Sequence, residues 1–248
     1  MDDMTKAIKL IALDMDGTLL TPELEVSKRN NEAIQEALNQ GIQVVLSTGR
    51  GFQGCYPYAK ELNLQTFLIT ANGGEVWTVE KELLRQKLLA NDIVEKLYAV
   101  TEEVGIRRWM ISTEKVFYDD EFVNIQDYQW LKFGCASEDQ EKLNEVKRRL
   151  AGFSGLELTN SLPTNIEINP EGVSKADALD FLCKRTGISM EEVMAVGDSL
   201  NDVKMIQEAA VGVAMGNAQE KIKEVADAIT SSNTEDGVGK AIEKFALR

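Results

Sequence analysis

Two aspartates follow the first strongly apolar run of this sequence. Asp14 and Asp16 come directly after residues 8–13, a run typical of a strand buried on both faces. Because side chains alternate along an extended chain, both carboxylates project to one side and Met15 to the other. Two carboxylates that repel each other at the end of a buried strand need a cation or a shared proton. An Asx-type turn closed by Gly17 is the alternative explanation.

Two further points have residues that suit a phosphate group. The segment STGR at residues 47–50 follows a second β-rich run, and a hydroxyl with loop N–H groups before a helix suits a phosphate oxygen. Lys175 follows Ser174 at the predicted start of a helix, where a cation opposes the helix dipole by about 0.3–1 kcal/mol. A bound phosphate would reverse that penalty, because the lysine and the N–H groups would bind it together. A lysine that extends into solvent is the alternative.

The segment GDSLND at residues 197–202 supplies a third carboxylate. Asp198 comes at the end of a strand predicted at residues 193–196. Asn201 and Asp202 fall in the first turn of the next helix, where an acidic residue is favourable in any case. Asp202 is therefore either a helix-end charge or a partner that supports the metal ligands from behind. Three carboxylates for a hard cation, with a hydroxyl and a lysine for a phosphate, describe a magnesium-dependent phosphoryl-transfer site.

Alternating strands and helices are predicted around these points at both ends of the chain. The N-terminal elements are expected at residues 8–13, 28–40, 42–46, 52–62 and 66–71. After Ser174 strands and helices alternate again. A helix comes first, followed by strands at residues 193–196 and 211–215 and helices at residues 200–210, 219–226 and 238–245. This βαβαβ order predicts a parallel sheet with right-handed crossovers. Such sheets bind ligands at the carboxyl ends of their strands, where the residues above would lie.

The middle of the chain has a different pattern. Apolar and polar residues alternate at residues 108–112, 156–159 and 165–168, between helices predicted at residues 92–104 and 138–150. This alternation is typical of a half-exposed antiparallel sheet with helices on one side. We therefore expect an α/β fold with a Rossmann-like, doubly wound parallel sheet formed by residues 1–81 and 171–248. Residues 82–170 would form an inserted α+β domain.

Composition limits the classes of function. With 27 Lys+Arg, 41 Asp+Glu and a net charge of −14, we expect neither a nucleic-acid nor a membrane partner. Histidine is absent, which excludes Ser-His-Asp and Cys-His catalysis and histidine-ligated metal sites. The cysteines Cys55, Cys135 and Cys183 form no CxxC pair, which favours a reducing compartment. Because Asp2 and Asp3 are the wrong charge for a signal peptide, we expect a cytoplasmic protein.

Four short motifs together resemble those of the haloacid dehalogenase superfamily. They are DMDGT at residues 14–18, STGR at 47–50, the lysine of GVSKADAL at 172–179 and GDSLND at 197–202. More narrowly, the chain resembles the Cof-type phosphatases of subfamily IIB, which carry an α/β cap, here residues 82–170. Further segments that fit this branch lie at residues 71–74, 168–173, 214–218 and 233–237. Ala176 departs from the pattern, because the family often has glycine after the lysine.

The resemblance implies roles for the candidate residues. Asp14 would be the nucleophile that forms an aspartyl-phosphate, and Asp16 the general acid for the leaving group and then the base for the hydrolytic water. Mg²⁺ would be held by Asp14, Asp198 and the main-chain carbonyl of Asp16, and would offset the repulsion between two anions. The transferring phosphate would contact the Met15 N–H, Thr48, Gly49, Lys175 and Asn201.

These roles describe a Mg²⁺-dependent phosphatase of a small phosphorylated metabolite, present as a monomer or weak dimer. A phosphomutase is one alternative, with Arg85, Arg107 or Arg108 as a second phosphate clamp. A non-catalytic sensor of phosphorylated ligands is another, although Asp14 and Asp16 are both intact. Sugar phosphates, nucleotides, and flavin or pyridoxal phosphates all fit as substrates. The aromatic residues that either line the pocket or form the core of the cap are Trp77, Trp109, Tyr128, Trp130 and Phe133.

Overall fold

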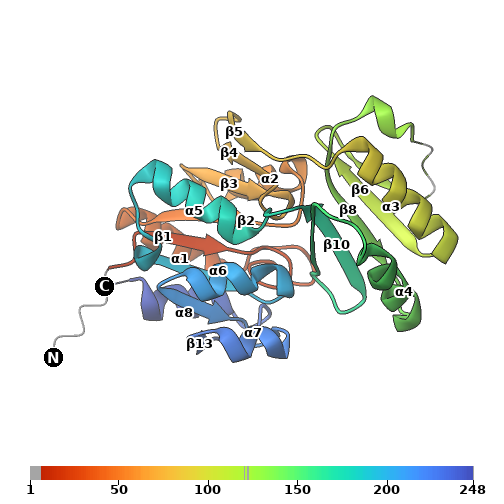
Figure 1. Cartoon of the computed structure of the whole chain (residues 1–248). Helices are drawn as coiled ribbons and strands as arrows, with labels where there is room; N and C mark the ends of the chain where they lie inside the picture. Colours follow the sequence, from red (N-terminus) through yellow and green to blue (C-terminus); the bar gives the residue numbers. More distant parts are fainter. Residues whose placement is uncertain (1–6, 120, 122, 248) are drawn as a thin grey trace.

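A computed structural model describes residues 7–119, 121 and 123–247, so Asp2 and Asp3 lie outside the described residues. The chain forms two sheets that lie beside each other (Figure 1). The larger sheet has the strand order β13-β12-β11-β1-β2-β3-β4-β5. Its strands are β1 (Leu10–Leu13), β2 (Gln43–Ser47), β3 (Phe67–Thr70), β4 (Glu75–Thr78), β5 (Leu83–Gln86), β11 (Val193–Gly197), β12 (Val211–Ala214) and β13 (Ala228–Ile229).

Parallel pairing joins β13 through β3 in this sheet, and β4 and β5 add an antiparallel edge. From β1 the chain builds the sheet outward in one direction through β2 and β3, and later in the other through β11, β12 and β13. The carboxyl ends of β1 and β11 therefore meet at the point where the strand order reverses, which is where open α/β sheets bind ligands. The predicted doubly wound sheet is confirmed.

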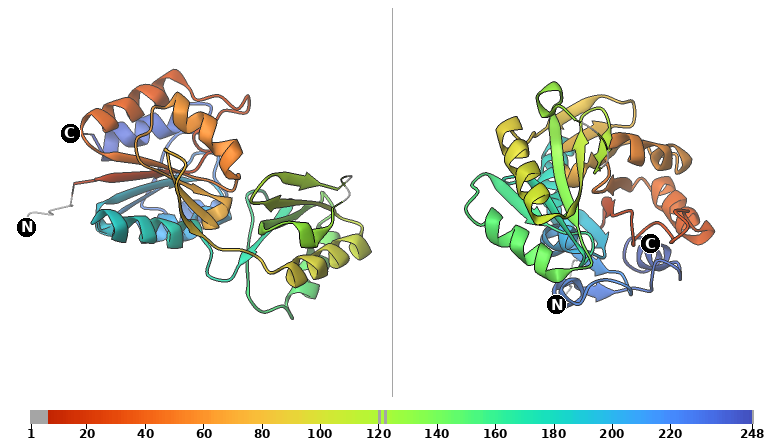
Figure 2. Two further views of the ribbon diagram at one scale, coloured as in Figure 1. Left: turned by 90° about the horizontal axis from the view of Figure 1, so that it is seen from above. Right: turned by 90° about the vertical axis from the view of Figure 1, so that its right-hand side faces the viewer.

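Helices cover both faces of the larger sheet (Figure 2). Along β1 the side chains of Ile11 and Leu13 pack on one face and those of Leu10 and Ala12 on the other, which explains why the strand is apolar throughout. One face is covered by α1 (Lys28–Asn39), α2 (Phe52–Glu61) and α8 (Gly237–Phe245). The other is covered by α5 (Lys175–Thr186) and α6 (Val203–Glu208), and α7 (Glu220–Val225) packs against α6.

The smaller sheet is antiparallel throughout, with the order β7-β6-β8-β10-β9. Its strands are β6 (Arg107–Ser112), β7 (Val116–Tyr118), β8 (Trp130–Ala136), β9 (Leu156–Thr159) and β10 (Asn165–Pro170). Both helices, α3 (Asn91–Val104) and α4 (Gln140–Leu150), pack on one face of it. We call this unit the cap. Its other face is turned toward the ends of β1 and β11, and this separation of faces explains the alternating sequence.

Strand pairing alters the expected boundary at residue 82. Residues 83–86 form β5, which pairs with β4 in the larger sheet, so these residues lie with the core and not with the cap. The chain crosses to the cap only after Gln86, and it returns at the end of β10. Sequence alone missed this because β4 and β5 are short and antiparallel, as the cap strands are. Within the described part of the chain, no helix is long and apolar enough to cross a membrane.

The turn between β3 and β4 packs against the start of α5. Gly73 has φ +98°, and a β-carbon there would lie 2.3 Å from the carbonyl oxygen of Ser174. Gly187, at the other end of α5, also has a positive φ, +74°, but its β-carbon would meet open space. The two positions therefore share the backbone conformation and differ in the contact.

We expect Gly73→Ala to destabilise the protein more than Gly187→Ala. A left-handed conformation costs a residue with a β-carbon about 1–2 kcal/mol, and the contact with Ser174 should add about 1–3 kcal/mol at residue 73 only. Urea unfolding of both variants measures the difference. Equal losses of unfolding free energy would contradict the close packing of this turn on α5.

Candidate active site

A buried lysine joins two of the predicted carboxylates. Lys175 is the first residue of α5, which Ser174 caps, and its side chain is completely buried. Its Nζ donates to Oδ1 of Asp14 at 2.5 Å and to Oδ1 of Asp202 at 2.7 Å. Burial acts to lower the pKa of Lys175, but the charges of Asp14 and Asp202 outweigh it and raise the pKa. The ammonium is thus fixed against Asp14, and the alternative of an exposed lysine is wrong.

Three carboxylates gather at the ends of β1 and β11. Oxygen atoms of Asp14, Asp198 and Asp202 all lie within 4.8 Å of one another and could hold a metal ion. Burial, together with the charge of Asp202, raises the pKa of Asp198 to about 6. Burial also raises the pKa of Asp14 well above its usual range; Lys175 acts to lower this pKa, whereas Asp202 and Asp198 act to raise it. The cluster therefore carries more negative charge than one ammonium balances, and a divalent cation with a preference for oxygen ligands suits it.

Hydrogen bonds separate the roles of Asp198 and Asp202. Asp198 accepts from the hydroxyls of Thr18 at 3.2 Å and Ser199 at 3.0 Å. Asp202 is fully buried, and its Oδ2 accepts from the backbone N–H groups of Asp198 and Ser199. With Lys175 on its other oxygen, Asp202 is bonded on both of its oxygens, so a helix-end charge alone does not describe it. Its role as a partner that supports metal ligands stays a prediction.

Arg50 holds the side chain of Asp16. Its Nε donates to Oδ2 of Asp16 at 2.8 Å and its Nη2 to Oδ1 at 2.5 Å, which makes a two-pronged ion pair. The Asp16 side chain is 49% exposed, whereas that of Asp14 is 7% exposed. The two carboxylates of the first motif therefore lie in different environments. Sequence reasoning quoted Arg50 within STGR but gave it no role, because nothing local links it to Asp16.

A large cavity separates the core from the cap. Its volume is about 770 Å³, and its core side includes Asp14, Asp16, Gly49, Asp198 and Asn201. Lys175 lies behind Asp14, and the side chains of Met15 and Thr48 are fully buried. The Met15 side chain packs in the core, as the alternation along β1 predicts. The contacts of the Met15 N–H and Thr48 with a phosphate remain predictions.

A buried polar network, missed in the sequence, joins the cap to the core at Gly49 and Asn72. Lys132 on β8 donates to Glu167 on β10 at 2.9 Å and to the carbonyl of Gly49 at 2.8 Å. Asn72 donates to the other oxygen of Glu167 at 2.8 Å and accepts from Asn201 at 3.3 Å. The network connects residues that are far apart in the sequence, and no local pattern signals it.

Four of the five aromatic residues fit one or other of the two alternatives, and Trp77 fits neither, because it belongs to β4 of the larger sheet. Tyr128, Trp130 and Phe133 pack in the core of the cap, and Trp77 packs on Phe52 beside the larger sheet. Trp109 differs, because it lines the cavity.

The arginines considered for a second phosphate clamp lie elsewhere. Arg85 binds Asp177 on α5, and Arg108 packs over Tyr98 and binds Glu102. Neither these two nor the exposed Arg107 lines the cavity. The observation that would favour a phosphomutase is therefore not found at these positions.

Known proteins resemble this chain over nearly its whole length. Residues 11–242 match the family model of haloacid dehalogenase-like hydrolases, so the chain belongs to that family. A Bacillus subtilis relative, the 5-amino-6-(5-phospho-D-ribitylamino)uracil phosphatase YcsE, is 48% identical over 240 residues, which are 97% of this chain and 96% of the relative.

Solved structures agree with this assignment. A haloacid dehalogenase-like hydrolase from B. subtilis superposes with a TM-score of 0.89 at 28% identity, over 96% of this chain and 99% of that one. A subclass IIB sugar phosphatase shares the fold, with a TM-score of 0.86 at 24% identity. The match covers 97% of this chain and 100% of that one. The resemblance to the Cof-type phosphatases is confirmed, and the chain is a phosphatase of this superfamily.

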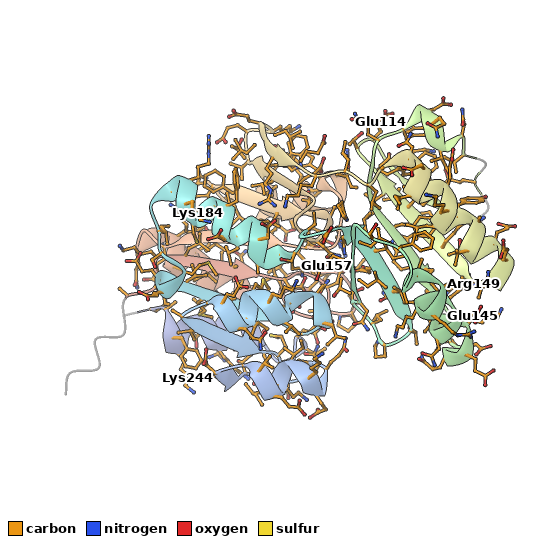
Figure 3. All side chains as sticks on the ribbon, viewed as in Figure 1. Glu114, Glu145, Arg149, Glu157, Lys184 and Lys244 are labelled. Carbon is orange, nitrogen blue, oxygen red and sulfur yellow. The ribbon has the colours of Figure 1, made fainter. Side chains whose placement is uncertain are left out.

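We expect the buried pair of Lys132 and Glu167 to contribute strongly to stability. Glu167→Gln leaves a buried ammonium without its counter-charge and should cost about 3 kcal/mol. The matched control is Glu157→Gln, which breaks the 2.7 Å pair with Lys204 between cap and core, where the side chains are 30% and 51% exposed. Figure 3 shows Glu157 at the junction of the two units. The control should cost less than about 1 kcal/mol.

Acid pH provides a second test of this pair. Burial acts to raise the pKa of Glu167, but Lys132 and the hydrogen bond from Asn72 outweigh it, so the pKa lies below its usual value. The ionised pair therefore stabilises the protein above the usual glutamate pKa of about 4.3 and stops doing so as the pH falls through the lowered pKa. Glu167→Gln should lack this part of the acid destabilisation in urea unfolding at several pH values. An unchanged pH profile would contradict the assignment.

Proposed function

We propose that this protein hydrolyses a small phosphomonoester in a Mg²⁺-dependent reaction that passes through an aspartyl-phosphate on Asp14. The observation that carries the proposal is the position of Asp14. Asp14 lines the cavity, and its Oδ1 accepts a hydrogen bond from the buried ammonium of Lys175. The carboxylate of Asp198 lies beside it. The cysteines do not compete as nucleophiles, because all three are buried and burial raises the pKa of Cys55 and Cys135 to about 12.

The chemistry requires attack by one anion on another. An oxygen of Asp14 forms a bond to phosphorus while the bond to the leaving alkoxide breaks, and Asp16 gives the alkoxide a proton. Water then attacks the phosphorus of the aspartyl-phosphate, Asp16 takes its proton, and inorganic phosphate and free Asp14 result. Lys175 fits this role because its positive charge is desolvated and already in place, so it offsets the repulsion without reorganisation.

Mg²⁺ would be held by Asp14 and Asp198, with the main-chain carbonyl of Asp16 that the family resemblance implies. The donor set fits, because it is made of oxygens and because burial, together with the neighbouring carboxylates, raises the pKa of Asp14 and Asp198. When bound, the ion supplies charge stabilisation for the transferring phosphoryl group. Asp202 supports this site through its bonds to Lys175 and to the backbone of residues 198 and 199.

Asp16 must leave Arg50 to act as the acid, because both of its oxygens are bonded to the guanidinium. Entry of a phosphate dianion beside Asp16 supplies a reason for the exchange, since the dianion attracts Arg50 and disfavours a charged Asp16. Asp16 could then carry the proton that the leaving alkoxide takes. The pairing with Arg50 thus keeps the acid near Asp14 before substrate arrives.

The relative with 48% identity suggests a substrate. Its name describes a phosphatase of a uracil that carries a phosphorylated ribityl chain. We propose that this chain acts on the same compound or on one of its size, because a cavity of about 770 Å³ is far larger than a phosphate group needs. A panel that contains this compound, sugar phosphates, nucleotides and flavin phosphates would rank the candidates by kcat/KM.

Phosphate release tests the proposed reaction. Purified protein should release inorganic phosphate from a phosphomonoester with Mg²⁺ present and lose this activity in EDTA. Asp14→Asn should lower kcat by at least about 10⁴-fold, because an amide is a weak nucleophile. Lys175→Met should lower it by about 10²–10³-fold. The control Asp92→Asn changes an exposed aspartate on α3 and should leave kcat within about twofold of wild type.

Other outcomes separate the alternatives. A phosphomutase would convert its substrate into an isomeric phosphate ester instead of releasing phosphate. A sensor would bind phosphorylated compounds without turnover. Full activity in EDTA, or in Asp14→Asn, would contradict the proposal.

A further inference from the structure

The side of the cap sheet that faces the cavity carries charged side chains at one end and mainly apolar side chains at the other. At the β8 and β10 end it carries the buried ion pair of Lys132 and Glu167. At the β6 and β7 end four apolar or aromatic side chains line the cavity, namely Trp109, Ile111, Val116 and Tyr118, and the end of β6 with the turn that follows it adds Ser112, Glu114 and Lys115. The cavity thus has an ionic region that contacts Gly49 and an apolar surface on β6 and β7 that the proposed chemistry does not use.

Trp109 lies over a glycine in this apolar region. In the antiparallel pairing of β6 with β8, Trp109 stands directly opposite Gly134. A β-carbon on residue 134 would come within 2.2 Å of two indole carbons and 2.8 Å of a third. The indole therefore lies across the backbone of β8, in space that a side chain at any other residue type would fill. Glycine weakens a strand, so its presence here has to be offset by the ring that covers it.

The other tryptophans are used differently. Trp130 is fully buried, and its indole N–H donates to the carbonyl of Ile125 at 3.0 Å. The N–H of Trp77 donates to Glu75 at 3.0 Å. Trp109 is only partly buried, and its indole N–H has no hydrogen-bond partner among the described residues. A buried tryptophan usually finds a partner for this group, whereas Trp109 is half-buried and lines the cavity.

We propose that Trp109, laid over Gly134, is the surface on which a planar ring of the substrate's leaving group stacks. The inference rests on the proposed phosphatase function and adds to it a preference for phosphomonoesters whose alcohol carries an aromatic or heteroaromatic ring. Trp109 and Asp14 line the same cavity, so one molecule can reach both. Trp109 is then a specificity-determining residue, and Gly134 positions it.

Matched pairs of substrates test the stacking directly. Phenylalkyl phosphates and cyclohexylalkyl phosphates with equal spacers, from one to five carbons, share the alkoxide leaving group and similar apolar area, but only the phenyl ring is flat. At the best spacer, the wild-type kcat/KM should favour the phenyl compound by about tenfold. Trp109→Leu should reduce this preference to within about twofold, and Trp109→Phe should keep part of it.

A double-mutant cycle tests the role of Gly134. A methyl group at this position displaces the indole, so Gly134→Ala should also reduce the phenyl preference. In the Trp109→Leu background the same substitution should change the preference no further, because the ring that it displaces is gone. Activity toward the cyclohexyl compounds reports folding, and in each variant it should fall less than the activity toward the phenyl compounds does.

Three results would overturn the inference. They are a wild-type enzyme that hydrolyses both compounds of every pair equally, a phenyl preference that survives Trp109→Leu, and an equal loss of activity toward both compounds. If the wild type hydrolyses no phosphomonoester at all, the proposed function fails instead, so the two failures are distinguishable.

Discussion

An excess of buried negative charge at the ends of β1 and β11 constrains the whole site. Asp14, Asp198 and Asp202 lie within 4.8 Å of one another, and among them the one buried ammonium is that of Lys175. Such a cluster is unfavourable in a folded protein unless a cation or a proton relieves it. The raised pKa values of Asp14 and Asp198 express that cost. The same constraint explains why a metal-assisted reaction fits here, because the ion that relieves the charge also stabilises a phosphoryl group.

The fold meets this constraint through topology. Reversal of the strand order beside β1 brings Asp14 and Asp198 to adjacent strand ends, although they are far apart in the sequence. The start of α5 then places Lys175 from the opposite side, and the β3–β4 turn fixes that start through Gly73. Every one of these elements belongs to the larger sheet or packs on it, so the charged cluster is held by strands and helices of the core and not by loops of the cap.

The cap solves a different problem. Its helices cover one face of its sheet, so the other face is free to line the cavity. Lys132 and Glu167 tie that face to Gly49 and Asn72, and Lys204 ties Glu157 to the core at the junction seen in Figure 3. By contrast, Glu145 and Arg149 lie at the outer end of the cap in the same view. The two sheets thus share one cavity, with the proposed chemistry on the core side and the proposed selectivity on the cap side.

Sequence reasoning was most successful where local pattern and topology agree. The apolar run before Asp14, the strand before Asp198 and the N-cap residue Ser174 before Lys175 all give local signals. The doubly wound sheet and the positions of these residues were therefore predictable. The burial of Lys175 was not, because an isolated lysine at a helix start gives no sign of its partners.

Contacts between residues that are far apart in the sequence could not be predicted from it. The pairing of Arg50 with Asp16 joins two motifs 34 residues apart. The pair of Lys132 and Glu167 requires that β8 and β10 be neighbours in the cap sheet. The position of the Trp109 ring depends on the register of β6 and β8, which sets Trp109 opposite Gly134. Register is a property of paired strands, and a single strand sequence does not specify its partner residue.

The most direct measurement of the central claim is to trap the covalent intermediate. Rapid acid quench of the enzyme during turnover of a radiolabelled phosphomonoester, followed by peptide mapping, should place the label on Asp14. The labelled bond should be cleaved by hydroxylamine, as an acyl phosphate is. Label on any other residue would contradict the account. A full burst of phosphate release with no labelled protein at any quench time would also contradict it and would indicate direct attack by water.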